Sequence, residues 1–93
     1  MNLKDCNGKV PVFVGGAAPY KVVDFPTRKA FDLMYKRSNP AMQDKIWSIL
    51  KMRSAGHVYR DVGERYGLTP ERIRQIEAKF LRRVAASLTT DSP

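Results

Sequence analysis

Residues 57–84 read HVYRDVGERYGLTPERIRQIEAKFLRRV, and this stretch decides the fold. Two helices that cross steeply through a tight turn need a small residue where they touch and a residue that tolerates positive φ in the turn. Gly63 meets the first requirement and Gly67 meets the second. Apolar residues at matching positions would face inward: Val62, Tyr66, Leu68, Ile73 and Ile76. The stretch therefore predicts a helix-turn-helix over about residues 58–86.

The last helix of this motif has two faces of different chemistry when its residues are placed about 100° apart. One arc is apolar and predicts the buried face: Ile73, Ile76, Phe80 and Val84. The opposite arc is more polar: Glu71, Arg74, Gln75, Ala78, Lys79 and Arg82. In the DNA major groove, Gln can pair with adenine, Glu can accept from cytosine, and Arg can bind guanine or phosphate. The polar arc therefore favours sequence-specific binding of double-stranded DNA.

Capping signals set the expected ends of the helices. A short helix is expected over Val58–Tyr66. Thr69 as N-cap and Pro70 at the first position begin the last helix, which we expect to reach about Ala86. The polar residues 88–93 are expected to form a disordered tail.

Two further helices are predicted upstream of the motif. Thr27 can cap a helix that runs to about Arg37. Asn39 as N-cap and Pro40 as first helical residue then begin a helix that runs to about Arg53. Apolar residues recur at helical spacing in both: Ala30, Phe31, Met34, Met42, Ile46, Ile49 and Leu50.

Residues 1–24 differ from the helical part. KVPVFV (9–14) and YKVVDF (20–25) are β-prone runs, and GGAAP (15–19) between them is typical of a turn. A hairpin is possible, and because an isolated hairpin is marginal in water, it must dock on the helices or stay mobile. Pro11 favours an edge strand or no strand.

The chain has 93 residues, which suffice for one small domain. We therefore expect a mostly α fold: a small helical domain over residues 25–87 with a C-terminal helix-turn-helix, preceded by a short extended or β-hairpin segment. The net charge of +8 and the pI near 10.0 indicate a polyanionic partner, such as nucleic acid, an anionic membrane surface or an acidic protein patch. A chain this small is not expected to be an enzyme.

Several other functions find little support in the residues. Cys6 is the one cysteine, expected in a mobile segment, so an internal disulfide and a thiolate-rich zinc site are excluded. His57 has no ligand cluster beside it, and Trp47 is expected in the core or lining a groove. We expect no metal, no cofactor and no small-molecule substrate. The chain lacks a signal-peptide stretch and a run of about 18 apolar residues, so we expect a cytoplasmic protein that does not enter membranes.

The run ERIRQIEAK (71–79), within TPERIRQIEAKFLRRV, resembles the recognition helix of region 4 in bacterial primary sigma factors. The preceding YRDVGERYGL resembles the first helix of the same motif, and the resemblance is clear over about residues 56–85. It implies that the chain recognises a −35-type promoter element in the major groove. It also implies that the earlier helices dock on the β flap of bacterial RNA polymerase.

The resemblance implies particular residue functions. Glu71 and Gln75 would touch bases, while Thr69, Arg74 and Lys79 would hold phosphates or neighbouring base edges. The predicted DNA-binding set contains these five residues and two more cations, Arg72 and Arg82. Its members are therefore Thr69, Glu71, Arg72, Arg74, Gln75, Lys79 and Arg82.

The sequence also departs from the family. Pro70 stands where the primary factors usually have a base-contacting arginine, and Phe80 replaces a small alanine on the buried face. Nothing resembles the region that opens DNA at the −10 element, so a complete sigma factor is not expected. The alternative is a module that binds RNA polymerase or a sigma factor, with little DNA binding of its own. Its β-prone arm could then add a strand to a partner sheet.

Some charged residues allow more than one interpretation. Glu77 lies beside the apolar arc and is expected to pair with an arginine, either Arg60 or Arg72. Glu71 could simply complement the helix dipole, and Arg82 and Arg83 could be ordinary cations near a helix C-terminus. The exposed charged face could also be only solvated surface.

Overall fold

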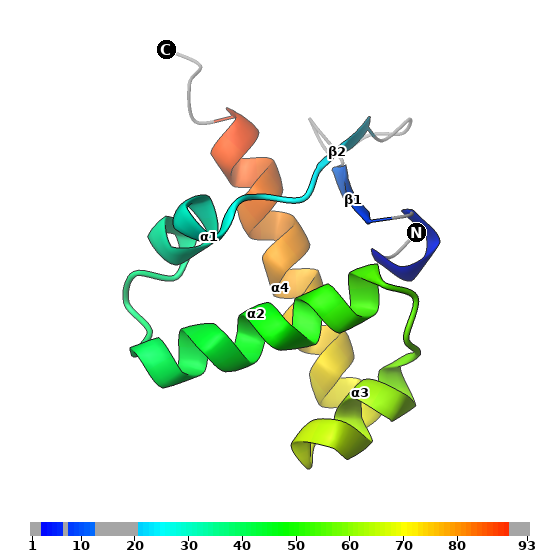
Figure 1. Cartoon of the computed structure of the whole chain (residues 1–93). Coiled ribbons are helices and arrows are strands. Elements are labelled where there is room, and N and C mark those ends of the chain that lie inside the picture. Colours follow the sequence, from blue (N-terminus) through cyan, green and yellow to red (C-terminus); the bar gives the residue numbers. More distant parts are fainter. Residues whose placement is uncertain (1–2, 7, 13–20, 90–93) are drawn as a thin grey trace.

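The computed structural model describes residues 3–6, 8–12 and 21–89, and the mostly α fold expected from the sequence is confirmed over these ranges (Figure 1). Each α-helix begins after a residue in extended conformation or a side-chain cap. The elements, in chain order, are the 3-10 helix η1 (Leu3–Cys6), strands β1 (Lys9–Val12) and β2 (Lys21–Asp24), and helices α1 (Arg28–Met34), α2 (Pro40–Ser54), α3 (Tyr59–Tyr66) and α4 (Pro70–Thr89).

The predicted helix caps are all in place. The Thr27 hydroxyl accepts from the backbone N–H of Ala30 at 3.2 Å, and the Asn39 side chain accepts from that of Met42 at 2.7 Å. The Thr69 hydroxyl accepts in the same way at 3.1 Å, from the third residue after it. Each cap satisfies an N–H that the first helical turn leaves without a backbone partner.

Helix α3 ends at Tyr66 as expected, but the C-terminal ends of α1 and α4 differ from the expected ones. Helix α1 ends at Met34, earlier than the expected Arg37, because the chain turns at Tyr35, whose carbonyl accepts from the Ser38 N–H at 2.9 Å. Helix α4 continues to Thr89, so the first two residues of the expected tail are helical. Residues 90–93 lie outside the described residues.

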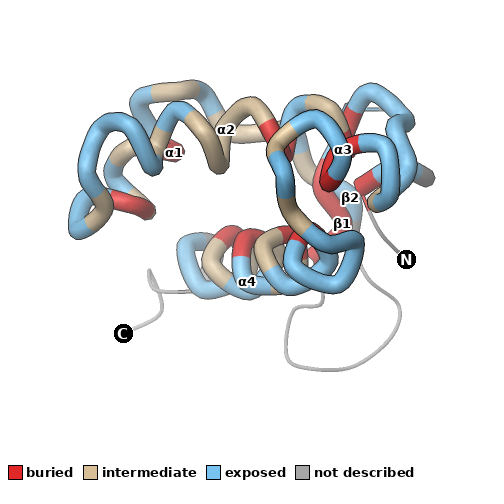
Figure 2. Tube along the Cα trace, turned by 90° about the horizontal axis from the view of Figure 1, so that it is seen from below, coloured by how far each residue is buried: buried red, intermediate tan, exposed pale blue. Residues whose placement is uncertain are grey.

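The helices form two layers. Helix α2 crosses α4 in Figure 1, and in Figure 2 α4 lies in a layer of its own, with its buried residues turned towards α1, α2 and α3. The main core fills the space between the layers and reaches the N-terminal segment: Leu3, Val10, Val12, Phe31, Tyr35, Leu50, Phe80 and Val84. Phe80 packs 5.5 Å from Phe25 and 6.4 Å from Phe31, measured between ring centroids.

The N-terminal hairpin docks on this core. Strands β1 and β2 are antiparallel, with Val10 opposite Val23 and Pro11 opposite Val22. Val10 and Val12 are buried, which gives the marginal two-stranded sheet the apolar support that it needs. Pro11 is tolerated because each strand of a two-stranded sheet is an edge strand. The expected turn GGAAP, with the flanking residues 13–14 and 20, lies outside the described residues.

Cys6 was expected in a mobile segment, and that expectation is wrong. Its side chain is buried in η1, next to the fully buried Leu3. Composition alone could not show this, because η1 is buried by its packing against β1 and against α2, which is distant in sequence.

The turn of the helix-turn-helix depends on two glycines, as predicted. Gly67 ends α3 with φ 69°, in the left-handed region. At Gly63, an added Cβ would lie 2.4 Å from the carbonyl oxygen of Leu68, so only glycine allows this close approach. The Leu68 N–H also donates to the Gly63 carbonyl at 2.8 Å. Beneath the turn lies the motif core, formed by Ile49, Val62 and Ile73.

Glu77 is buried, and its partner is Arg53, not Arg60 or Arg72 as expected. Its carboxylate accepts from Arg53 Nε at 3.2 Å and from Arg53 Nη2 at 3.3 Å. It also accepts from the Leu3 backbone N–H at 3.1 Å and from the Tyr59 hydroxyl. The expectation failed because Glu77 faces α2, and Arg60 instead lies on the exposed side of α3.

Arg53 is buried as deeply as Glu77 and completes this network. It is 1% exposed, donates to the His57 carbonyl at 2.8 Å, and stacks over the Tyr59 ring at 3.7 Å. Burial and the hydrogen bond to Glu77 raise the pKa of the Tyr59 hydroxyl. The network thus joins η1, α2, α3 and α4 at one point.

Replacing Gly63 with alanine should lower the free energy of unfolding by about 1–3 kcal/mol, because the new methyl group overpacks against backbone. Urea denaturation measures the change. Gly67→Asn is the comparison, since asparagine tolerates positive φ and nothing lies within 4 Å of the added Cβ. It should lower the free energy of unfolding less than Gly63→Ala does. A more stable Gly63→Ala protein, as helix propensity alone predicts, would contradict the close contact.

Replacing Glu77 with glutamine should lower the free energy of unfolding by about 3–5 kcal/mol, because it leaves the Arg53 charge buried without a carboxylate. The double variant Arg53→Met/Glu77→Leu should recover a large part of this loss. Glu64→Gln is the control, since the exposed pair of Glu64 with Arg60, at 3.9 Å, should contribute less than about 1 kcal/mol to the free energy of unfolding. Equal losses at Glu64 and Glu77 would contradict the network.

Candidate nucleic-acid interface

Every residue of the predicted DNA-binding set is exposed, and one element presents them all. Helix α4 buries Ile73, Phe80 and Val84 against the other layer, so the opposite arc faces solvent. Thr69 lies just before the helix as its N-cap, and its hydroxyl retains a hydrogen to donate. The other members lie on α4 itself: Glu71, Arg72, Arg74, Gln75, Lys79 and Arg82.

One flank of this exposed arc is an ion pair. Arg74 donates to the Glu71 carboxylate through Nε at 2.9 Å and through Nη2 at 2.5 Å. The hydrogen bond from Arg74 is the main cause that lowers the pKa of the Glu71 carboxyl, and Gln75 adds a smaller hydrogen bond. Glu71 in turn raises the pKa of Arg74. On this flank the two charges cancel locally, and the Glu71 and Arg74 side chains hold each other in place.

The other flank of α4 borders a hollow. Its volume is about 450 Å³, and its lining residues come from α4, from α2 and from the connection between α1 and α2. We call it the basic hollow. Its α4 wall contains four members of the predicted set, and no Asp or Glu of the described residues lines it. All ten lining residues are Tyr35, Ser38, Met42, Ile46, Arg72, Gln75, Ile76, Lys79, Arg82 and Arg83.

Sequence reasoning missed the half of the hollow that comes from α1 and α2. The spacing of Met42 and Ile46 shows only that they are apolar positions of one helix. The place of Tyr35, Met42 and Ile46 opposite α4 depends on the packing of the two layers. Tyr35 is 5% exposed, and its hydroxyl has no hydrogen-bond partner among the described residues.

Arg83 is anchored in the structure, where the sequence left it open between a phosphate contact and a helix cation. Its guanidinium donates to the Met34 carbonyl at the end of α1 and lies 4.6 Å from the Tyr35 ring centroid. Arg82 has no such anchor and is exposed in the basic hollow. The two neighbouring arginines therefore differ in how far they can move.

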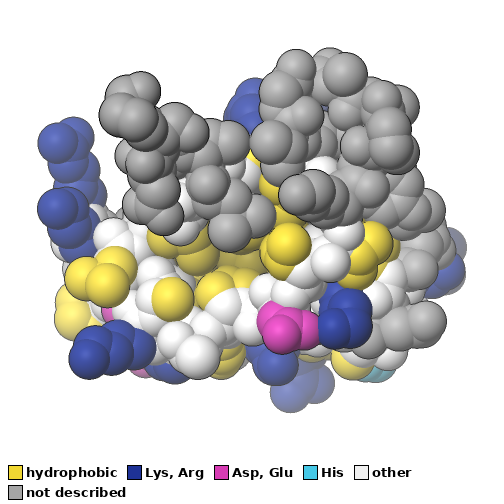
Figure 3. All heavy atoms as spheres, turned by 90° about the horizontal axis from the view of Figure 1, so that it is seen from above, with side chains coloured by type: hydrophobic (Ala, Val, Ile, Leu, Met, Phe, Trp, Pro, Cys, Tyr) yellow, Lys and Arg dark blue, Asp and Glu magenta, His cyan; other side chains and the backbone are white. Residues whose placement is uncertain are grey.

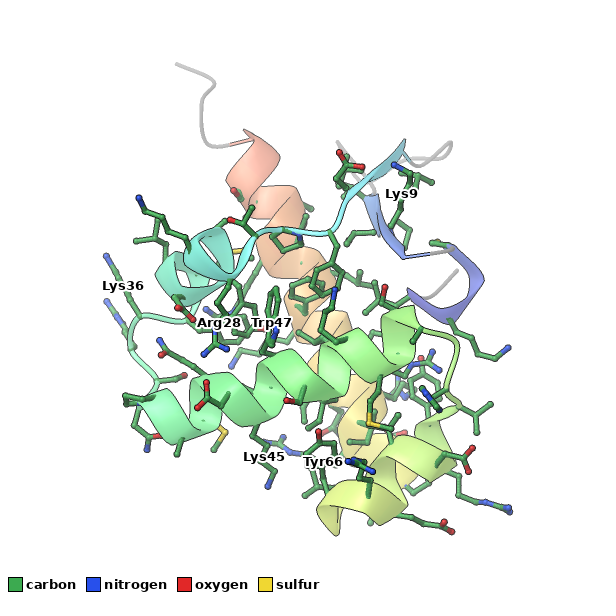
Figure 4. All side chains as sticks on the ribbon, viewed as in Figure 1. Lys9, Arg28, Lys36, Lys45, Trp47 and Tyr66 are labelled. Atoms are coloured by element: carbon green, nitrogen blue, oxygen red, sulfur yellow. The ribbon has the colours of Figure 1, made fainter. Side chains whose placement is uncertain are left out.

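Some cations outside α4 are paired with acids. Lys9 lies 2.6 Å from Asp24, and this contact lowers the pKa of the Asp24 carboxyl. Arg28 binds Asp32 at 2.8 Å and Asp44 at 2.5 Å, and Figure 4 shows it beside Trp47. These pairs leave the side of α4 that borders the basic hollow as a positive surface without an acidic neighbour in its lining.

Two other surfaces differ from the basic hollow. The face seen from above in Figure 3 has hydrophobic side chains at its centre. A smaller hollow of about 170 Å³ is lined there by Val23, Asp24, Pro26, Ala30, Met34, Val84 and Ser87. Trp47, expected in the core or lining a groove, packs edge-on against Phe31 at 5.1 Å and lines a shallow hollow between α2 and α3.

Comparison with protein-family models, with curated proteins and with solved structures gave no match. Within residues 3–6, 8–12 and 21–89, no three or more His, Cys, Asp or Glu side chains come together as they would around a metal ion. No helix in that part of the chain combines the length and apolar character needed to cross a bilayer.

Replacing Arg74 with alanine should raise the pKa of Glu71 towards its ordinary value, and NMR titration of the carboxyl carbon measures it. In the native protein the lowered pKa means that the pair is intact above the ordinary carboxyl pKa and is lost as the pH falls through the lowered one. Arg60→Ala, which removes a different exposed pair, should leave Glu71 unchanged. An unchanged Glu71 pKa in Arg74→Ala would mean that the pair does not form in solution.

Proposed function

We propose that this chain is a sequence-specific DNA-binding transcription regulator that inserts α4 into the major groove. The observation that carries the proposal is the helix-turn-helix crossing at Gly63, which presents the polar arc of α4 to solvent with every member of the predicted set exposed. The B-DNA major groove is about 12 Å wide and admits an α-helix. Helix α4, with 20 residues, is about 30 Å long and can cross it.

The two flanks of α4 suit different parts of the duplex. Gln75 lies between them, where it can pair with adenine, and Glu71 can accept from cytosine while Arg74 holds its carboxylate in position. Arg72, Lys79 and Arg82 on the other flank lack this neutralisation and suit backbone phosphates. Affinity for DNA would then come mainly from the flank with Arg72, Lys79 and Arg82. Base preference would come from Glu71 and Gln75.

The resemblance to sigma region 4 supports a finer proposal. We propose that the chain binds a −35-type promoter element and acts with bacterial RNA polymerase. Pro70 at the start of α4 cannot supply the arginine contact of the primary factors, so its preferred element should differ from their consensus at that base. Phe80 changes only the buried side of α4, where it joins the main core.

The alternative, docking on RNA polymerase or a sigma factor with little DNA binding, keeps one supporting observation. Leu33 is 66% exposed and Met42 is 44% exposed near the α1–α2 connection, where Lys36 and Arg37 are also exposed. Its other argument, a free β-prone arm, is weaker because the apolar side chains of β1 are buried in the main core.

Fluorescence anisotropy with a labelled duplex containing a −35 element, and with a scrambled duplex, tests the proposal. We expect tighter binding to the −35 element, and a log–log salt slope of about −3 to −5 if three to five cations meet phosphates. Gln75→Ala should remove most of the preference, a change of about 1–3 kcal/mol.

Lys79→Ala is the matched variant, because it should weaken both duplexes alike and reduce the slope by about 1. Equal affinity of the native chain for both duplexes at every salt concentration would reject base recognition by α4. No binding to either duplex would favour the docking alternative, with pull-down of RNA polymerase as the next measurement.

A further inference from the structure

The basic hollow has the size of a small-molecule site. Its volume of about 450 Å³ lies within the range of known ligand pockets, about 300–1,000 Å³. Apolar surface comes from Met42, Ile46 and Ile76, and Met42 is 44% exposed there. Such surface gains nothing from contact with the charged backbone of DNA, so the binding of phosphates alone does not account for it.

The Tyr35 hydroxyl is the second observation. It is buried and lacks a partner among the described residues, and a buried hydroxyl without a hydrogen bond is costly. Burial also raises the pKa of Tyr35, so the group keeps its proton and can donate. What is missing next to it is an acceptor, and the guanidinium of Arg83, 4.6 Å from the Tyr35 ring centroid, cannot be one.

The charges around the hydroxyl indicate which acceptor would fit. Arg72, Lys79, Arg82 and Arg83 line the hollow, and none of the described acids does. Arginine forks match phosphate oxygens, and several cations together favour a group with more than one negative charge. Gln75 adds an amide that can hydrogen-bond a polar ring edge.

We propose that the basic hollow binds a phosphorylated small molecule of nucleotide size. Its phosphates contact Tyr35 and the surrounding arginines, and its ring lies on Met42 and Ile46. The proposal builds on the proposed function in one respect: Arg72, Lys79 and Arg82 would serve both ligand and DNA, so each excludes the other. A ligand of this class would then release the protein from DNA.

DNA is the other source of phosphate, and the burial of Tyr35 argues against it. Arg72, Lys79 and Arg82 are exposed, whereas Tyr35, which lines the same hollow, is only 5% exposed. A small ligand can reach the Tyr35 hydroxyl if the anchored Arg83 exchanges its hydrogen bond to the Met34 carbonyl for one to a ligand phosphate. The backbone of a duplex seated on the exposed arc stays with the exposed cations.

Isothermal titration calorimetry of the full chain with ATP, GTP, pyrophosphate and adenosine tests the proposal without DNA. We expect at least one triphosphate to bind more tightly than pyrophosphate, and adenosine to bind least. Tyr35→Phe removes only the hydroxyl and should weaken triphosphate binding about tenfold, the effect of one hydrogen bond to a charged group. It should melt at the native temperature or above, because the lost group is unpaired in the free protein.

Tyr66→Phe is the matched control, since Tyr66 belongs to α3 and is not among the residues that line the basic hollow. It should leave triphosphate binding unchanged. In the anisotropy assay, the triphosphate that binds should displace the −35 duplex from the native chain, and about ten times more should be needed with Tyr35→Phe. The duplex affinity of Tyr35→Phe without nucleotide should equal that of the native chain.

The outcomes separate this proposal from the proposed function. No triphosphate binding, or equal binding by native protein and Tyr35→Phe, overturns the ligand site and leaves DNA binding untouched. Weaker duplex binding by Tyr35→Phe without nucleotide also overturns it, because the hydroxyl would then serve a DNA phosphate. Triphosphate binding by a chain that fails to bind any duplex supports the site and rejects the proposed function.

Discussion

The carboxylate of Glu77 is the point on which the arrangement of the helices depends. It accepts hydrogen bonds from α2, from the start of α3 and from η1, and it is carried by α4. A carboxylate this deep in a protein is tolerated only when its oxygens are satisfied and its charge is matched, so these hydrogen bonds restrain the positions of α2, α3 and η1 relative to α4. The orientation of the exposed arc of α4 follows from this constraint.

The local features of the fold could be predicted from the sequence, because they depend on neighbours a few residues apart. The caps at Thr27, Asn39 and Thr69 and the two glycines of the turn belong to this class. The partner of Glu77 could not be predicted, since Arg53 lies 24 residues away and reaches it only through the packing of two layers. The burial of Cys6 could not be predicted for the same reason, since η1 packs against the distant helix α2.

The candidate site likewise has features that the sequence could predict and features that it could not. Helical spacing sufficed to predict which residues of α4 are exposed, because a single helix fixes that pattern. Spacing could not predict that Glu71 and Arg74 neutralise each other while Lys79 and Arg82 border a hollow, because that difference depends on side-chain geometry and on α2. One helix therefore carries two chemically distinct flanks, which a list of exposed residues does not distinguish.

The bond between the Leu3 amide and Glu77 spans 74 residues of chain. During synthesis, η1 and β1 are made before their buried partners on α4. At about 5–20 residues per second, the N-terminal segment waits about 4–15 s for Glu77 to be added. The N-terminal segment cannot gain its contacts with α4 in that interval, so its docking must follow the synthesis of α4.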